Sequence, residues 1–248
     1  MGTLITAPAI VVHTQRWSES SKIVKLFTPR GMVKVIAKGA LRPKSEFRGV
    51  VEVLNEIEAV WSVKETRGLQ VLISASLVHG FHGIRAHLEK TAVAYAMLEI
   101  IQQVIHGGEA FPTLFEYIEK WLSRLEVAGQ GEIMGYFWHF LVRLSAELGF
   151  ALQVGMCRSC EQPLKDFPAY LEITTGNFYC GKCAPSRMSG EGLMLEQGTY
   201  QYLARLVQEP LPPTGMDAES FPLTDILLKH LQYHTDIPLQ LNALKWLG

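Results

Sequence analysis

Apolar and polar positions alternate along the first 80 residues, which is the pattern of β-strands. Runs rich in β-branched residues occupy 9–13, 23–27 and 32–36, and turn residues separate them. Two further runs, 51–61 and 69–77, show the same period of two. Short antiparallel strands that follow one another so closely favour a small closed barrel, and the five-stranded barrel that binds oligonucleotides is the OB-fold.

The alternation also predicts which side chains fill the barrel. In the third run Val33, Val35 and Ala37 share one face, and Lys34, Ile36 and Lys38 share the other. In the fourth run the inward positions are Val51, Val53, Ile57, Ala59 and Trp61, and the outward positions are Glu52, Glu56 and Glu58. We therefore expect the inner face of the sheet to be buried. We expect its outer face to be basic and to carry these glutamates in contact with solvent.

Near residue 80 the spacing of the apolar residues changes to about 3.6, which is the helical period. Three helices are expected at about 88–105, 113–125 and 132–148, each with one apolar stripe. The stripes consist of Leu88, Ala92, Tyr95, Leu98, Ile101 and Ile105, then Phe115, Ile118, Leu122 and Leu125, then Met134, Phe137, Leu141, Leu144 and Leu148. Further helical segments are expected at 196–207, 222–234 and 239–247. Such stripes are nearly always core, so we assign them no chemistry.

The cysteines of the chain form two C-x-x-C pairs, Cys157 with Cys160 and Cys180 with Cys183, separated by nineteen residues. This spacing is typical of a tetrahedral zinc site, because each pair can turn two thiolates toward one ion. Two short strands around a turn at Gly176 would return the chain to the second pair. Four protein ligands leave no position for a catalytic water, so we expect structural Zn²⁺ in a hairpin inserted at about 155–187.

Two other uses of the cysteines stay open. Two disulfides would need an oxidising compartment, but the sequence shows no signal peptide, so we expect a reducing, cytoplasmic location. A redox-active site would need one C-x-x-C motif near a βαβ pattern.

Composition excludes a membrane protein and reveals a charge asymmetry. No run approaches the roughly 18 apolar residues that a membrane helix needs. The first 50 residues hold nine basic residues against two glutamates, a balance of +7, which leaves −8 for the rest of a chain whose net charge is −1. We predict that this basic region contacts a polyanion, and a solvated basic face without a ligand is the alternative. The candidate DNA-binding residues are Arg16, Lys22, Lys25, Arg30, Lys34, Lys38, Arg42, Lys44 and Arg48.

Motifs of the common catalytic sites are missing from the sequence. It contains no G-x-x-x-x-G-K-[ST] loop, no G-x-G-x-x-G after a strand, no H-E-x-x-H and no G-x-S-x-G. Two histidine pairs, His79 with His82 and His230 with His234, have no third local ligand, so ordinary histidines are favoured over a metal pair. We therefore assign no catalytic residue and expect a protein that is not an enzyme.

A basic barrel, a helical body and a four-cysteine insertion in this order resemble the RecO family of bacterial recombinational-repair proteins. The resemblance covers essentially the whole chain. Its most specific segments are Glu19-Ser-Ser-Lys22, Leu26-Phe-Thr28 with Gly31, Ala37-Lys38-Gly39-Ala40, Arg42-Pro-Lys-Ser45 and Leu148-Gly-Phe150. The chain departs from the family at Leu41, where many members carry another basic residue.

The resemblance implies an OB-fold domain at 1–80, a helical domain at 81–248 with the zinc insertion, and no enzymatic turnover. It also implies a role in DNA repair and recombination after DNA damage, near the bacterial nucleoid. Single-stranded DNA would be bound and annealed, and double-stranded DNA is a further candidate ligand. The implied protein partners are RecR and the acidic C-terminal tail of single-stranded DNA-binding protein, so that RecA can be loaded.

The residues agree with such a role, and other roles stay open. Basic side chains on a barrel can follow a phosphate backbone, which gives salt-sensitive and sequence-tolerant affinity. Trp17 and Phe47 lie beside basic residues and either stack on bases or fill the barrel. One alternative is a zinc-stabilised interaction scaffold that binds protein partners without direct DNA contact. Another is a nucleic-acid-processing enzyme whose site residues are dispersed along the chain.

Overall fold

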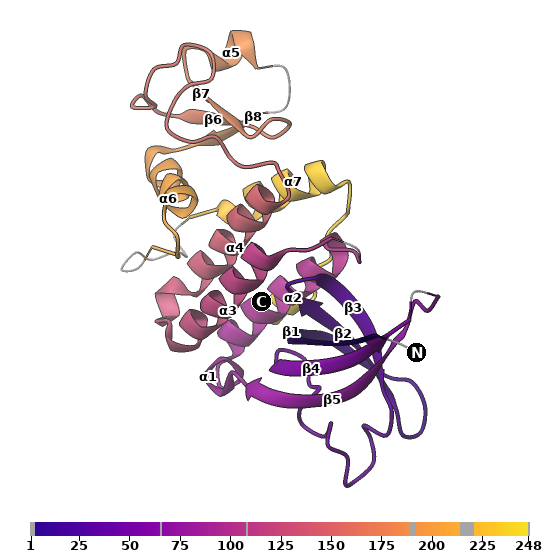
Figure 1. Ribbon diagram of the computed structural model, residues 1–248. Coiled ribbons are helices and arrows are strands. Elements are labelled where there is room, and N and C mark those ends of the chain that lie inside the picture. Colours follow the sequence, from indigo (N-terminus) through magenta and orange to yellow (C-terminus); the bar gives the residue numbers. More distant parts are fainter. Residues whose placement is uncertain (1–2, 65, 108, 189–191, 214–220, 248) are drawn as a thin grey trace. The chain divides into compact units, whose positions relative to one another are not determined.

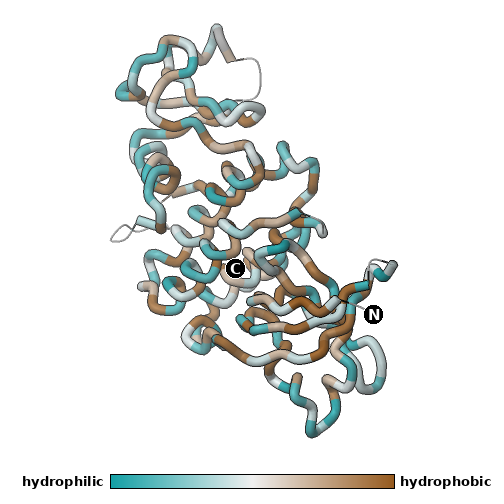
Figure 2. Tube along the Cα trace, viewed as in Figure 1, coloured by the Kyte–Doolittle hydropathy of each residue, from teal (hydrophilic) through white to brown (hydrophobic). Residues whose placement is uncertain are grey.

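The computed structural model describes residues 3–64, 66–107, 109–188, 192–213 and 221–247 (Figure 1). The chain forms two compact units, one comprising Met1–Val127 with Gln240–Gly248 and the other Ala128–Leu239. Hydrophobic residues concentrate along the strands and within the helices, and hydrophilic residues lie at loop tips (Figure 2). The predicted boundary near residue 80 marks the change from strands to helices, and a separate domain at 1–80 stays a prediction.

The first unit begins with a closed sheet. Its strands are β1 (Thr3–Arg16), β2 (Lys22–Thr28), β3 (Gly31–Ala37), β4 (Glu56–Val63) and β5 (Gln70–His79). They neighbour one another in the order β1-β2-β3-β5-β4, and the first half of β1 pairs with β4 while its second half pairs with β2, which closes the sheet. Within the described residues the pairs are antiparallel except for β3 with β5. The five predicted strands therefore exist and form a barrel.

Alternation along the strands fills the barrel interior. The predicted inward residues that are buried there are Val35, Ala37, Ile57, Ala59 and Trp61. Val33 is half-buried, whereas Lys34 and Lys38 are exposed, so β3 has the two faces that its sequence predicts.

The fourth strand begins at Glu56, later than its sequence pattern predicts. Leu54 has a left-handed φ of +78°, and the side-chain amide of Asn55 donates to the carbonyl oxygen of Gly49 at 2.8 Å. The chain therefore turns before it enters the strand. Val51 still reaches the barrel core, but it does so from the connection between β3 and β4.

Helices cover part of the outer face of the barrel. They are α1 (His82–Arg85), α2 (Leu88–Val104) and α3 (Pro112–Val127). Ile10 on β1 and Phe27 on β2 are cross-strand partners that are fully buried outside the barrel core, and the Phe27 ring lies 5.8 Å from that of Phe115 on α3. Gln102 of α2 donates to the carbonyl oxygen of Val12 at 3.0 Å. The prediction that the whole outer face is basic is therefore wrong, because apolar residues pack under helices there.

The helical stripes are largely as predicted, with a correction at each end. Leu88 is 61% exposed, because it is the first residue of α2 and precedes the buried stretch. The segment predicted as a helix at 239–247 forms only the short 3₁₀ helix η3 (Ala243–Leu247). Ala243 donates its N–H to Glu99 Oε2 at 3.3 Å, and the ring of Trp246 lies 5.8 Å from that of Tyr95, so this distant segment packs on α2.

The second unit combines helices with a small sheet. Its helices are η1 (Gln130–Glu132), α4 (Ile133–Glu147), α5 (Ala184–Arg187), α6 (Gln197–Gln208) and α7 (Leu223–Thr235). Strands β6 (Ala169–Glu172), β7 (Asn177–Cys180) and β8 (Gly192–Leu195) form one sheet in the order β7-β6-β8. The third of these strands is missing from the sequence-based prediction. No helix of the described residues is long and apolar enough to cross a membrane.

Most residues of α4 are buried, beyond its predicted stripe. Phe137, Leu141 and Leu144 lie in the core as expected, while Met134 and Leu148 are only half-buried. Gly149 ends the helix with a φ of +92°, a conformation that glycine adopts without strain.

Candidate metal centre and nucleic-acid interface

The four cysteines predicted to bind a metal come together in the second unit. The Sγ atoms of Cys157, Cys160, Cys180 and Cys183 all lie within 4.8 Å of one another, and none of them forms a disulfide. Four sulfurs at about 2.3 Å from a tetrahedral ion would lie about 3.8 Å apart, which is compatible with this separation. Among the described residues, no other group of three or more His, Cys, Asp or Glu side chains is close enough to hold a metal ion.

Short turns and the small sheet position the two pairs. Cys157 donates its N–H to the carbonyl oxygen of Gln162 at 2.9 Å, and Cys183 donates its N–H to that of Cys180 at 3.0 Å. Cys180 ends β7, which pairs with β6 across the predicted turn. Gly176 in that turn has a φ of +70°, and a Cβ atom there would come within 3.1 Å of a backbone oxygen. Glycine is therefore strongly favoured in the hairpin that brings the second cysteine pair back to the first.

The surroundings of Cys157 favour its metal-binding form. This side chain is only 1% exposed. Burial alone raises the pKa of the thiol, but backbone hydrogen bonds at Cys160, Cys180 and Ser159 outweigh it and lower the pKa to about 6. The thiolate is the form that binds metal ions. A set of four sulfur donors suits a soft or borderline ion and not Mg²⁺ or Ca²⁺, which take oxygen ligands.

The paired histidines of α7 contact backbone carbonyl groups of the same unit. His230 is fully buried, with Nε2 at 2.9 Å from the oxygen of Phe150 and Nδ1 at 3.2 Å from the oxygen of Ile173. Burial lowers the pKa of His230. His234 stacks on the Phe150 ring at 4.7 Å and also reaches the Ile173 oxygen. These rings attach the end of the hairpin strand to α7, which agrees with ordinary histidines.

Glutamates of the barrel also have partners in the first unit, contrary to the predicted solvated face. Glu56 lies next to Glu119 of α3, and burial, followed by the charge of Glu56, raises the pKa of Glu119 to about 7. His79, at the end of β5, contacts Glu126 of α3 with 2.8 Å between Nε2 and Oε2. The contacts of Glu56 with Glu119 and of His79 with Glu126 therefore join the barrel to α3.

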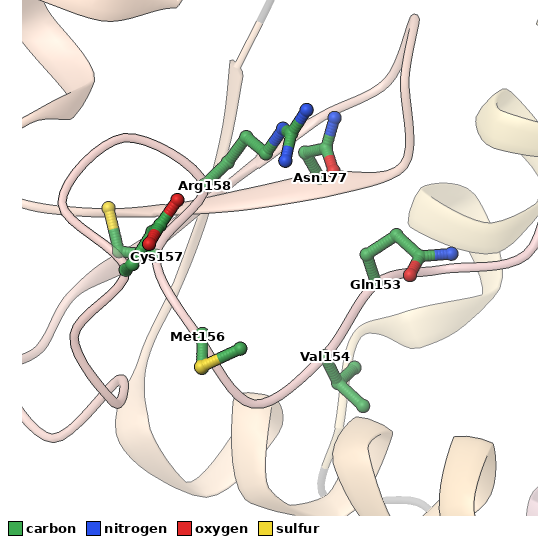
Figure 3. A pocket seen from close by; sticks show the side chains of 7 residues that line it. Gln153, Val154, Met156, Cys157, Arg158 and Asn177 are labelled. Atoms are coloured by element: carbon green, nitrogen blue, oxygen red, sulfur yellow. The ribbon is translucent and has the colours of Figure 1, made fainter.

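A hollow of about 210 Å³ lies beside the cysteine cluster (Figure 3). Its lining residues are Gln153, Val154, Met156, Cys157, Arg158, Glu161 and Asn177. Arg158 and Asn177 point to the same side of it (Figure 3). Because the lining includes one basic and one acidic side chain, its charge selects no class of ligand.

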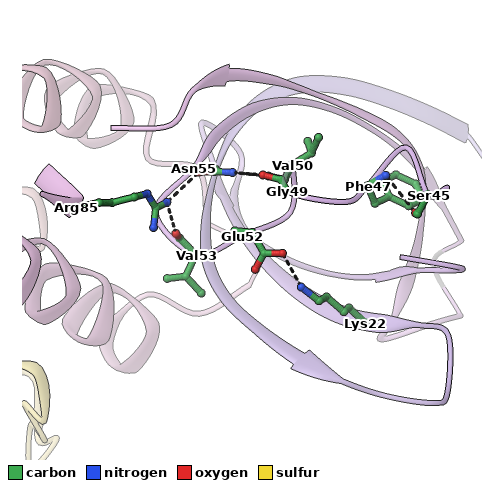
Figure 4. A network of polar contacts seen from close by, with 9 residues as sticks. All are labelled: Lys22, Ser45, Phe47, Gly49, Val50, Glu52, Val53, Asn55 and Arg85. Atoms are coloured by element: carbon green, nitrogen blue, oxygen red, sulfur yellow. Dashed lines mark hydrogen bonds and ion pairs between the residues drawn. The ribbon is translucent and has the colours of Figure 1, made fainter. Parts of the chain in front are cut away.

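Most of the predicted DNA-binding residues are accessible on the first unit. The exposed ones are Arg16, Arg30, Lys34, Lys38, Arg42, Lys44 and Arg48. Lys22 is half-buried, and its Nζ contacts Glu52 at 2.8 Å, which neutralises its charge locally (Figure 4). Lys25 is half-buried between His13 on β1 and Lys34 on β3, which are its cross-strand partners. Burial and then Lys25 lower the pKa of His13.

Residues 38–55 form an anchored cap on the barrel. Phe47, 4% exposed, and Val51 insert into the barrel core. Arg85 of α1 donates to the carbonyl oxygen of Val53 at 2.7 Å and to Asn55 Oδ1 at 2.9 Å (Figure 4). The exposed basic residues that this cap carries are Lys38, Arg42, Lys44 and Arg48.

The structure separates the two candidate aromatic residues and adds basic ones. Phe47 fills the barrel, whereas Trp17, just after β1, is 59% exposed and accessible to a base. Lys64 and Arg67 are exposed between β4 and β5, near Gln70. The predicted DNA-binding residues all come from the first 50 positions, so they do not include Lys64 and Arg67. The strand patterns on either side nevertheless predict a turn at these residues.

Two family models match the chain. The model described as recombination protein O N terminal matches residues 1–81, and the one described as recombination protein O C terminal matches residues 85–243. Relatives of the chain that carry the name DNA repair protein RecO include three from different bacteria. That of Chloroherpeton thalassium is 31% identical over 60% of this chain, and the match spans 58% of that protein. The protein of Chlorobium phaeobacteroides is 27% identical, and the match covers 95% of this chain and 93% of the relative. The protein of an Anaeromyxobacter species is 29% identical, and the match covers 90% of this chain and 89% of the relative.

Proposed function

Because the chain belongs to the recombination protein O family of DNA repair proteins, we propose that it binds and anneals single-stranded DNA as a non-enzymatic mediator of recombinational repair. The first unit supports this role. A closed five-stranded sheet in the order β1-β2-β3-β5-β4 suits an OB-fold, a barrel that binds oligonucleotides. We assign nucleic-acid binding to 1–80 and the helical domain with its insertion to 81–248.

The cross-strand pair of Lys25 and Lys34 carries the proposal. Like charges directly opposite each other destabilise a sheet unless a ligand or counter-ion neutralises them. A phosphate backbone across β2 and β3 would provide that negative charge, and the exposed basic residues of the cap would extend the contact. Annealing requires no chemical group, since it needs two strands held close with their charge neutralised and their bases free.

We further propose that Cys157, Cys160, Cys180 and Cys183 hold one structural Zn²⁺. The sulfur-only donor set and the clustering of its four atoms support this ion. Zinc would fix the hairpin and supply no catalysis, because the protein fills its coordination shell.

The family resemblance supports the partners that we propose. These are RecR, the acidic C-terminal tail of single-stranded DNA-binding protein and, indirectly, RecA during its loading. We place the protein in the bacterial cytoplasm, at the nucleoid during repair, with double-stranded DNA as a second ligand.

Titration of a labelled single strand at several salt concentrations, followed by an annealing assay with its complement, tests the proposed function. We expect affinity to fall steeply with salt, by about 0.7 in the logarithmic slope for each phosphate contact, and annealing to accelerate. Absence of binding at low salt would favour the protein-interaction scaffold. Cleavage or modification of the strand would indicate an enzyme.

A further inference from the structure

The interior of the barrel reaches solvent at one end. A hollow of about 250 Å³ lies there, with Ile5, Val33, Trp61 and Val63 among its lining residues. Ile5, Val33 and Val63 are half-buried and pack on the barrel core, whereas Trp61 belongs to that core and is 1% exposed. The floor of the hollow is therefore the apolar core of the barrel.

Strand direction explains why this end of the barrel is accessible. β4 is antiparallel to β1 and β5, so Val63 at its end lies beside the first residues of both. The opposite end of β4 follows the cap at residues 38–55, which inserts Phe47 and Val51 into the core. Of the described residues that line the hollow, none belongs to this cap. The accessible end is thus the one that the cap does not fill, and barrel mouths are common ligand sites.

Positive charge borders the apolar floor. Arg30, which precedes β3, and Lys34 are exposed residues of the lining, and the described lining residues include no carboxylate. The amide nitrogen of Gln70 donates to the carbonyl oxygens of Lys64 and Arg67. Both hydrogens of this amide therefore form hydrogen bonds within the loop and are not available to a ligand. The hollow suits a ligand with an apolar body and adjoining negative charge.

We propose that this hollow binds one unpaired nucleobase of a single strand, with the adjoining phosphates on Arg30 and Lys34. The proposal rests on the DNA-binding function above and names a base-binding subsite within it. The volume lies below the roughly 300–1,000 Å³ of sites for drug-sized ligands, which fits a single ring system. A base in a duplex is paired and stacked, so the subsite favours single strands. Binding through apolar contact and not through base edges makes it tolerant of sequence.

Comparison of an oligothymidylate with an abasic strand of the same length tests this subsite in the full-length protein. Both strands carry the same phosphates, but only the first has bases. We expect the oligothymidylate to bind roughly fivefold or more tightly at equal salt, from apolar contact of one base with Ile5, Val33 and Val63. Equal affinities would overturn the subsite while leaving the phosphate contacts intact, whereas no binding of either strand at low salt would overturn the proposed function itself.

Filling the hollow provides the matched variant. Val63→Phe places a larger side chain in the hollow and keeps every basic residue, so we expect the preference for bases to disappear while abasic binding is retained. Val60→Phe is the control, because Val60 lies on the same strand between the core residues Ala59 and Trp61 and faces outward. A preserved preference in folded Val63→Phe, or its loss in Val60→Phe, would contradict the assignment. If Val63→Phe does not fold, Ile5→Phe fills the same hollow from β1 and provides the second variant.

Discussion

Lys25 of β2 and Lys34 of β3 are direct cross-strand partners on the outer face of the barrel, and both carry positive charge. Such a pair destabilises a sheet by roughly 0.2–1 kcal/mol. Lys34 lines the same hollow as exposed Arg30, which makes the pair a candidate contact for phosphate groups. Stability and DNA binding therefore place opposite demands on this pair.

Lys34→Gln should separate those two demands. We expect the free energy of unfolding to stay constant or rise by up to about 1 kcal/mol, because the repulsion of Lys25 is removed. The logarithmic salt slope of single-strand binding should lose about 0.7, equivalent to one phosphate contact. Chemical denaturation and fluorescence titration measure the two quantities. Lys229→Gln, an exposed lysine of α7, is the control and should leave the slope unchanged. A slope equal to the parent's in Lys34→Gln would remove this residue from the interface.

Replacing Lys38, Arg42 and Lys44 together by Ala tests the cap. Three lost phosphate contacts should lower the salt slope by about 2 and weaken binding to strands of any sequence. Stability should change by no more than about 0.5 kcal/mol for each surface residue, since Phe47 and Val51 still anchor the cap. A folded triple variant that binds and anneals like the parent at every salt concentration would place the DNA elsewhere.

The control for the cap variant is a second triple variant with the same loss of charge. Lys120, Arg124 and Lys229 are exposed basic residues of α3 and α7. Their replacement by Ala should reduce binding much less, because none of them lies on the barrel.

Cys180→Ser should release the metal and destabilise the second unit. The parent protein is expected to carry about one zinc ion for each chain, and metal analysis of both proteins decides this. Stability should fall far more than DNA affinity, because metal binding is coupled to local folding and the basic residues belong to the first unit. Lys182→Ala is the control, since Lys182 lies between Cys180 and Cys183 in the sequence and its described ion pair with Asp166, at 3.8 Å, is exposed. Unchanged metal content in Cys180→Ser would exclude the four-cysteine site.

Glu119→Gln should stabilise the first unit at alkaline pH. The folded-state pKa of Glu119 is raised to about 7 from an ordinary value of 4.5, so the stability linked to its proton is complete below pH 4.5 and is lost as pH rises through 7. An uncharged glutamine avoids the cost of a half-buried charge beside Glu56. We expect a gain on the order of 1 kcal/mol near pH 8 and little change near pH 4, after allowance for solvent screening.

Thermal unfolding across this pH range measures the effect of Glu119→Gln. Glu109→Gln is the control, because Glu109 is exposed in the same unit and is not among the groups that raise the pKa of Glu119. If the stability of the two variants depended on pH in the same way, the pKa of Glu119 would not be raised.

The sequence by itself determines the elements that depend on local periodicity and spacing. Alternation places Ile57, Ala59 and Trp61 inside the barrel, because successive side chains of a strand point to opposite faces. The paired C-x-x-C motifs determine the metal-binding cluster, since two adjacent turns and one hairpin suffice to bring four sulfurs together.

Only the tertiary structure decides what covers each face. Periodicity shows that a side chain is buried, but not which distant segment buries it. Phe27 therefore lies under α3 and Phe47 plugs the barrel from a connection, although both occur among basic residues in the sequence. The hollow beside Val63 has the same origin, because it lies where strand ends of a closed sheet meet and no described residue of the cap at 38–55 lines it.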